Sequence, residues 1–171
     1  MCPTFLIPLF VAVFPALMAL AASMDLLTMT IPNRIPAALA FGYLVSAVAL
    51  GLPPQGVLFD LSCALAVLAL TFVMFSLRWI GGGDAKLAAA TALWMGWSSV
   101  LDYGLAAAIC GGLLTLGLLT ARATTLPAML ARHAWIARLH DRGAGVPYGI
   151  ALAAAGLVQY PHTQIWASSF V

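Results

Sequence analysis

Two aspartates stand out because the chain around them carries almost no other charge. Asp25 follows a long apolar run, and Asp84 ends the run Gly81-Gly82-Gly83-Asp84. All five acidic residues are aspartates, and charged residues make up 7% of the sequence. An ionised carboxylate in hydrocarbon is unfavourable by about 2.5–3.5 kcal/mol on insertion scales. Two carboxylates that share a site cannot both ionise easily, so the pair supplies a general base and a general acid. Hydrolysis of an amide by water needs both groups.

The glycine run before Asp84 suits such a site. Glycine lets the backbone turn sharply, and it lets a second extended backbone approach closely. We expect a helix to begin directly after Asp84, with its N-terminal dipole favouring the ionised carboxylate.

Each aspartate also has a simpler interpretation as a capping residue. Asp84 directly before a helix is a good N-cap, and Asp25 near Thr28 and Thr30 could cap or turn the chain. Asp60 and Asp102 fit the capping interpretation best, because each lies near a predicted helix start with no glycine run nearby.

The composition indicates a membrane protein. Hydrophobic residues make up 64% of the sequence, and the mean hydropathy is +1.06. About 20 apolar residues are needed to cross a hydrocarbon layer roughly 30 Å thick. We therefore predict an all-α polytopic membrane protein, a single integral-membrane domain over residues 1–171. Its roughly six transmembrane helices are expected near residues 5–24, 35–52, 57–77, 85–101, 103–121 and 146–160, with a break at Ser98-Ser99. We expect the first segment to be a retained helix, since Met1–Thr4 lacks the basic residues of a signal peptide.

With six crossings, every basic residue falls on one side of the membrane. These residues are Arg34, Arg78, Lys86, Arg122, Arg132, Arg138 and Arg142. Short loops rich in Lys and Arg mark the cytoplasm, so we expect both termini outside. Asp25 and Asp84 then both lie at the cytoplasmic end, where they can meet. Residues 122–145, between the fifth and sixth helices, combine basic residues with apolar ones at helical spacing. We expect a basic amphipathic helix on the anionic inner leaflet.

The sequence gives no reason to expect a cofactor, a metal or nucleic acid. Cys2, Cys63 and Cys110 are scattered and odd in number, which favours neither a disulfide framework nor a zinc site. The net charge of +2 is too small to indicate nucleic-acid binding. The glycine run followed by Lys86 lacks the GxxxxGK[ST] spacing of a phosphate-binding loop.

Three motifs together resemble the type IV prepilin peptidases, which are GxGD intramembrane aspartic peptidases. The motifs are Asp25-x5-Ile31-Pro32-Asn33, then Gly81-Gly82-Gly83-Asp84-Ala85-Lys86-Leu87, then Val146-Pro147-Tyr148-Gly149-Ile150-Ala151. They occur in order and cover nearly the whole chain. The resemblance implies that Asp25 and Asp84 are the catalytic aspartates and that Gly81 and Gly83 are the fixed glycines of the GxGD motif. It also implies that Pro32, Asn33 and the late Pro147, Tyr148 and Gly149 shape the site.

The resemblance also implies a substrate and a location. The family removes the short basic cytoplasmic leader of prepilins and pseudopilins, which is cut just before their hydrophobic helix. The expected location is the bacterial inner membrane, with the site at the cytoplasmic face. Larger members carry an N-terminal cytoplasmic insertion with paired CxxC motifs and also methylate the new N-terminus. The early connections here are short, so this chain is more similar to the short peptidases of Flp/Tad-type pilus assembly, and we do not expect methyltransferase activity.

Other interpretations remain open at this point. Lys86, the only lysine, could tune the aspartate pair or bind an acidic group of the substrate, or it could anchor the inner face by extending to the interface. For the whole chain, the alternatives are a small proton- or ion-coupled transporter and a non-catalytic assembly subunit whose glycines serve helix packing.

Overall fold

The computed structural model describes residues 7–169, with side chains from Phe10 onward, and every regular element in this range is helical. The elements are α1 (Ile7–Thr28), α2 (Arg34–Ala49), α3 (Pro54–Ser76), α4 (Gly82–Ala123), α5 (Ala128–Ala131), α6 (Ala134–His140), α7 (Tyr148–Gln159), the 3₁₀ turn η2 (Tyr160–His162) and α8 (Gln164–Ser168). The predicted all-α class is confirmed for this range. Cys2 and the start of the predicted first segment lie outside it.

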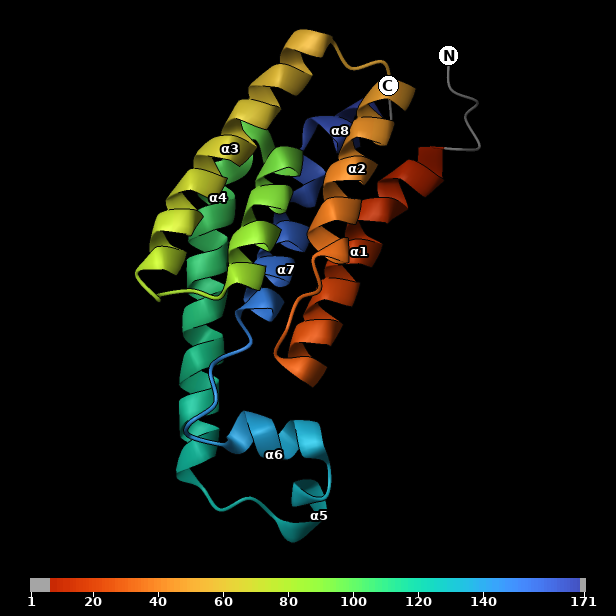
Figure 1. Ribbon diagram of the computed structural model, residues 1–171. Coiled ribbons are helices and arrows are strands. Elements are labelled where there is room, and N and C mark those ends of the chain that lie inside the picture. The colour runs from red at the N-terminus through yellow and green to blue at the C-terminus, as the bar shows by residue number, and fades with distance from the viewer. Residues whose placement is uncertain (1–6, 170–171) are drawn as a thin grey trace.

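The long helices run up and down beside one another (Figure 1). α1 ends and α2 begins at the lower end of the bundle in that view, and α3 also ends there. The segment with α5 and α6 projects below this end, and α7 returns from it into the bundle. The lower end therefore brings together the end of α1 with Asp25, the glycine run at the start of α4 and the Pro147–Gly149 motif at the start of α7.

The direction of α4 reverses at Gly96. Its 42 residues would form a straight rod about 63 Å long at 1.5 Å per residue, but Gly96 has the non-helical angles φ 61° and ψ −179°. The chain rises along α3 through residues 82–95, the first arm of α4, and descends through residues 97–123, the second arm (Figure 1). Because the arms lie side by side, Asp84 and Ala108 line one cavity. The predicted break at Ser98-Ser99 was two residues too late.

Asp60 of α3 lies against this reversal, and it is not the simple capping residue predicted above. It is buried, and Tyr43 of α2 donates a hydrogen bond to its Oδ2 atom. A Cβ atom built on Gly96 would lie 2.4 Å from Asp60 Oδ1, well inside van der Waals contact. The Tyr43–Asp60 pair thus ties α2 and α3 to the turn of α4, and it leaves room there only for glycine.

An aromatic cluster fills the centre of the bundle. The ring of Phe14 lies 5.0 Å from that of Trp94 and 4.7 Å from that of Tyr160. Trp94 is 2% exposed, and its indole N–H donates to the carbonyl of Leu39. These contacts join α1, α2, the first arm of α4 and η2, because each of the four elements contributes to them.

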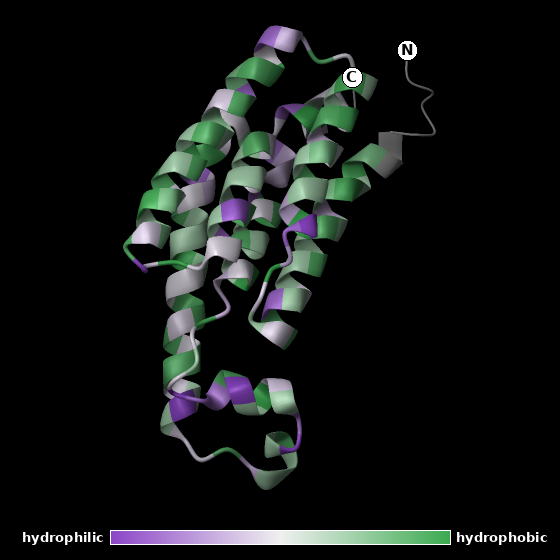
Figure 2. Ribbon diagram, viewed as in Figure 1, coloured by the Kyte–Doolittle hydropathy of each residue, from purple (hydrophilic) through white to green (hydrophobic). Residues whose placement is uncertain are grey.

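The outer surface is apolar, as a membrane-embedded bundle requires. Val48 and Leu101 are each 83% exposed, and Phe41 is 69% exposed. Figure 2 shows hydrophobic residues along the outside of the long helices, with hydrophilic ones gathered mainly at the lower end. In the described part of the chain, α1, α3 and α4 are long and apolar enough to span a bilayer. α7 has 12 residues and extends only about 18 Å, so six crossings remain a prediction.

The basic segment that follows α4 is divided into two short helices. α5 has four residues and α6 has seven, with extended backbone at His133 between them. The predicted single amphipathic helix over this segment was therefore wrong, although its basic residues do lie beyond the lower end of the bundle (Figure 2).

We predict that Gly96→Ala destabilises the protein by about 2 kcal/mol or more, because alanine disfavours a positive φ and its Cβ atom would collide with Asp60. Gly112→Ala is the matched control on the same helix, where a Cβ atom meets nothing within 4 Å. It should be neutral or slightly stabilising. The measurement is the unfolding midpoint in mixed detergent micelles, followed by tryptophan fluorescence. Equal midpoints for the two variants would contradict the prediction.

Candidate active site

Asp25 lies within the last turns of α1, not after the helix as predicted, because α1 continues to Thr28. Its side chain is 5% exposed, and its Oδ2 atom accepts a hydrogen bond of 2.7 Å from the Gly149 amide. The first amides of a helix have no partner within that helix and favour an anion. Asp25 therefore binds the N-terminus of α7, 124 residues further along the chain, and does not cap the turn at Thr28.

Gly149 allows this close approach. A Cβ atom at this position would lie 2.8 Å from Asp25 Oδ2 and 2.7 Å from the Ile31 side chain. The preceding Pro147 is fully buried. Gly149 of the Pro147–Gly149 motif thus lies directly against Asp25.

Asp84 lies in the first turn of α4, since the helix begins at Gly82 and Gly81 is the N-cap. The predicted helix start directly after Asp84 was therefore late, and Asp84 is not an N-cap. The Gly81 amide hydrogen-bonds to the half-buried carboxylate. The carboxyl groups of Asp25 and Asp84 lie close enough to interact electrostatically. The structure thus brings the two aspartates together from α1 and α4.

The glycine run and the Ile31–Asn33 connection pack against each other. A Cβ atom on Gly83 would lie 3.2 Å from Ile31 Cβ and 3.5 Å from the backbone N and O atoms of Ile31. A close approach of a second backbone was predicted for this run, and the chain's own connection between α1 and α2 makes it. Gly81 is exposed, and its nearest neighbour is the Asp84 side chain.

Lys86 bonds to the same connection. Its ammonium group donates a hydrogen bond of 2.9 Å to Asn33 Oδ1, and the Pro32 carbonyl accepts from the Ile35 amide. The Lys86 side chain is exposed. The observed bond joins the first two motifs to each other, and thereby holds the connection that packs on Gly83.

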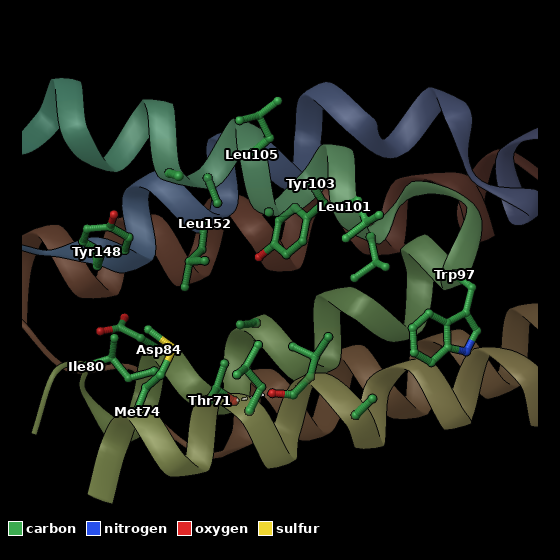
Figure 3. Close-up of a pocket in the computed structure, with 18 residues that line it drawn as sticks. Thr71, Met74, Ile80, Asp84, Trp97, Leu101, Tyr103, Leu105, Tyr148 and Leu152 are labelled. Atoms are coloured by element: carbon green, nitrogen blue, oxygen red, sulfur yellow. Dashed lines mark hydrogen bonds between the residues drawn. The ribbon is translucent and has the colours of Figure 1, made fainter. Parts of the chain in front are cut away.

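A cavity of about 730 Å³ adjoins Asp84. Its wall consists mostly of apolar side chains from α3, both arms of α4 and α7, including Leu70, Met74, Leu101, Leu105 and Leu152. Asp84 and Tyr148 lie toward one end, Trp97 lies at the other, and Tyr103 lies between them (Figure 3). The candidate site therefore continues into an apolar cavity that is open to the outer surface, where Leu101 and Leu105 are exposed.

Two residues of this region were missed by the sequence analysis. Tyr103 is 3% exposed and lines the cavity. Gly111 receives the Tyr148 ring so closely that a Cβ atom there would lie 2.1 Å from its hydroxyl oxygen. A lone tyrosine or glycine in an apolar helix carries little sequence signal. Both positions could have been noticed only by asking which polar or small residues share one face of the second arm.

The fold and the site together define a class: an all-helical membrane protein in which carboxylates from two separate helices converge at one end of the bundle. The sequence model of the type IV leader peptidase family matches residues 12–116, more than half of the 171-residue chain. The chain belongs to the type IV leader peptidase family and is therefore a protease. The match includes both aspartates and the glycine run, whereas the Pro147–Gly149 motif lies beyond it. Comparison with curated proteins gives no significant match, and neither does comparison with solved structures.

We predict that Gly149→Ala lowers peptidase activity by about tenfold or more. The added methyl group would displace the Asp25 carboxylate, and a displacement of about 1 Å can lower the rate of an enzyme by that factor or more. Gly145→Ala is the control in the same connection, since a Cβ atom there meets nothing within 4 Å. Cleavage rates are compared at equal amounts of folded enzyme. Equal rates for both variants would show that the contact at Gly149 does not position Asp25.

Proposed function

We propose that this protein is a prepilin peptidase that cuts by an aspartic mechanism, with Asp25 and Asp84 as its catalytic pair. The supporting observation is the convergence of these two carboxylates, which come from helices far apart in the sequence. Membership of the type IV leader peptidase family supports the same substrate class. The substrates are prepilins or pseudopilins, and the reaction removes their short basic leader.

The chemistry follows from two carboxyl groups that share one proton. The protonated carboxyl donates a hydrogen bond to the carbonyl oxygen of the scissile peptide. The ionised carboxylate takes a proton from water, and the water oxygen adds to the carbonyl carbon. The carbon–nitrogen bond then breaks as the amine leaves with that proton, so the products are an acid and an amine with no covalent enzyme intermediate. The Gly149 amide holds Asp25 throughout, because it donates to Oδ2 and leaves Oδ1 for water.

The orientation we propose places this site at the cytoplasmic face of the bacterial inner membrane, with both termini outside. The basic residues support it, because they lie at and below the lower end of the bundle. A leader that stays in the cytoplasm would reach the aspartates from this side. The short connection from α1 to α2, residues 29–33, supports assignment to the compact Flp/Tad-type peptidases.

We predict that Asp25→Asn and Asp84→Asn each reduce cleavage by about 10²–10⁴-fold, since each removes one member of a general acid–base pair. The assay is leader removal from a co-expressed Flp-type prepilin, resolved on a gel. Asp102→Asn is the control, because Asp102 is exposed in the second arm of α4, away from the pair. Cleavage by either of the first two variants at the control rate would contradict the assignment of that residue.

The proposed orientation predicts opposite labelling of two single cysteines, Gln55→Cys at the start of α3 and Gly143→Cys between α6 and α7. Both positions are exposed. In a background with the native cysteines replaced by alanine, a membrane-impermeant maleimide should label Gln55→Cys in spheroplasts and Gly143→Cys only in inverted vesicles. The reverse pattern would place the site outside.

A further inference from the structure

We infer that the cavity beside Asp84 holds the apolar segment that follows the cleaved bond of the substrate, and that the Tyr103 hydroxyl hydrogen-bonds to the main chain of that segment. This inference rests on the proposed function, since it assigns the part of a prepilin that the site must hold besides its leader.

The shape and lining of the cavity fit an apolar peptide segment. The cavity begins at Asp84 and extends along the first arm of α4 to Trp97 (Figure 3). The first arm rises by eleven residues from Asp84 to Met95, which corresponds to about 16 Å, and Trp97 follows directly after the reversal at Gly96. Most of the wall between Asp84 and Trp97 is aliphatic. A segment that leaves the carboxylate pair in this direction would therefore enter an apolar environment immediately.

The Tyr103 hydroxyl is the second, independent observation. The side chain is 3% exposed, and the hydroxyl has no hydrogen-bond partner among the described residues. The nearby Thr91 donates its hydroxyl hydrogen to the Leu87 carbonyl, so it cannot donate to Tyr103 and could only accept from it. The Tyr103 oxygen points into the cavity (Figure 3). A buried hydroxyl without a hydrogen-bond partner is unfavourable. A ligand that supplies such a partner would therefore bind more tightly.

A peptide segment supplies that polar group, whereas a lipid acyl chain does not. A peptide bond can be hydrolysed only where the substrate backbone is extended, and an extended backbone in an apolar space has carbonyl and amide groups without partners. Tyr103 lies along the cavity from Asp84, where these groups would pass. The competing occupant, an acyl chain, would fill the apolar volume but leave the hydroxyl unpaired.

The cavity can be narrowed at a glycine in its wall. Gly104 lines it, and a Cβ atom on Gly104 meets nothing within 4 Å. Gly112 lies on the same arm, also has nothing within 4 Å, and does not line the cavity. Gly104→Leu and Gly112→Leu therefore add the same side chain inside and outside the cavity.

The first test compares these variants on a full-length Flp-type prepilin and on a peptide that ends about four residues after the cut. We expect Gly104→Leu to raise KM for the full-length prepilin about tenfold. For the short peptide, its kcat/KM should stay close to that of the wild type. Gly112→Leu should change neither. If Gly104→Leu behaves like Gly112→Leu on the full-length prepilin, the inference is overturned while the proposed function stands. If the wild-type protein cleaves no prepilin, the proposed function itself fails.

Photo-crosslinking gives a readout that needs no activity. Benzoylphenylalanine at position 104 or 112 is introduced into the inactive Asp84→Asn protein, which is then mixed with prepilin in membranes. Cross-links from position 104, but not from position 112, to the apolar segment of the prepilin are expected. Cross-links from position 104 to lipid alone would overturn the inference and identify the cavity as an acyl-chain site.

The role of the hydroxyl is tested by Tyr103→Phe, which keeps the ring and removes the hydrogen bond. We expect KM for the full-length prepilin to rise about fivefold with kcat nearly unchanged, as loss of one neutral hydrogen bond in binding predicts. Tyr160→Phe is the control, because it also loses a buried hydroxyl, which donates to the Val11 carbonyl away from the cavity. Equal KM values for Tyr103→Phe and the wild type would exclude the proposed hydrogen bond.

Discussion

The hydrogen bond between the Gly149 amide and Asp25 is the contact on which the arrangement of the site depends. A carboxylate at this depth is unfavourable unless donors surround it, and in a largely apolar bundle the available donors are the free amides at the N-terminus of a helix. α7 provides them. Because the bond fixes the end of α1 against the start of α7, it also sets the depth at which Asp84 can approach. Gly149 permits the contact, since any side chain at this position would occupy the space of the carboxylate.

The reversal of α4 provides the second half of the site. A continuous helix would carry residues 97–123 away from Asp84, so no cavity could form beside that carboxylate. The positive φ of Gly96 and the adjacent Asp60–Tyr43 pair turn the chain back. The second arm then forms the wall opposite Asp84, and Gly111 in that arm accommodates the ring of Tyr148. The reversal thus links Asp60, a buried acid far from the site, to the shape of the cavity beside Asp84.

The sequence predicted the helical class, the family and the order of the motifs, because these depend on composition and local patterns. It also placed Asp25 and Asp84 at one end of the bundle, since counting crossings needs only apolar runs. The reversal was misplaced because Gly96 lies within an apolar run, whereas the two serines after it resemble a break. The Ser98 hydroxyl instead donates to the Met95 carbonyl across the reversal at Gly96. Helix ends near Asp25 and Asp84, and the exposure of Tyr103, depend on tertiary packing that no local pattern records.

The basic residues below the bundle do more than indicate its orientation. Arg138 of α6 donates to the Leu27 carbonyl at the end of α1, two residues after Asp25. Arg122 is 7% exposed, and it donates to the carbonyl of Leu139 near the end of α6 and to that of Gly145 in the connection that leads to α7. Guanidinium groups that bind free carbonyls stabilise helix ends, both by hydrogen bonding and by opposing the helix dipole. The segment therefore braces both elements that hold the Asp25–Gly149 contact. The arginines of this segment, each with several donors, thus also help to hold the Asp25 carboxylate in place.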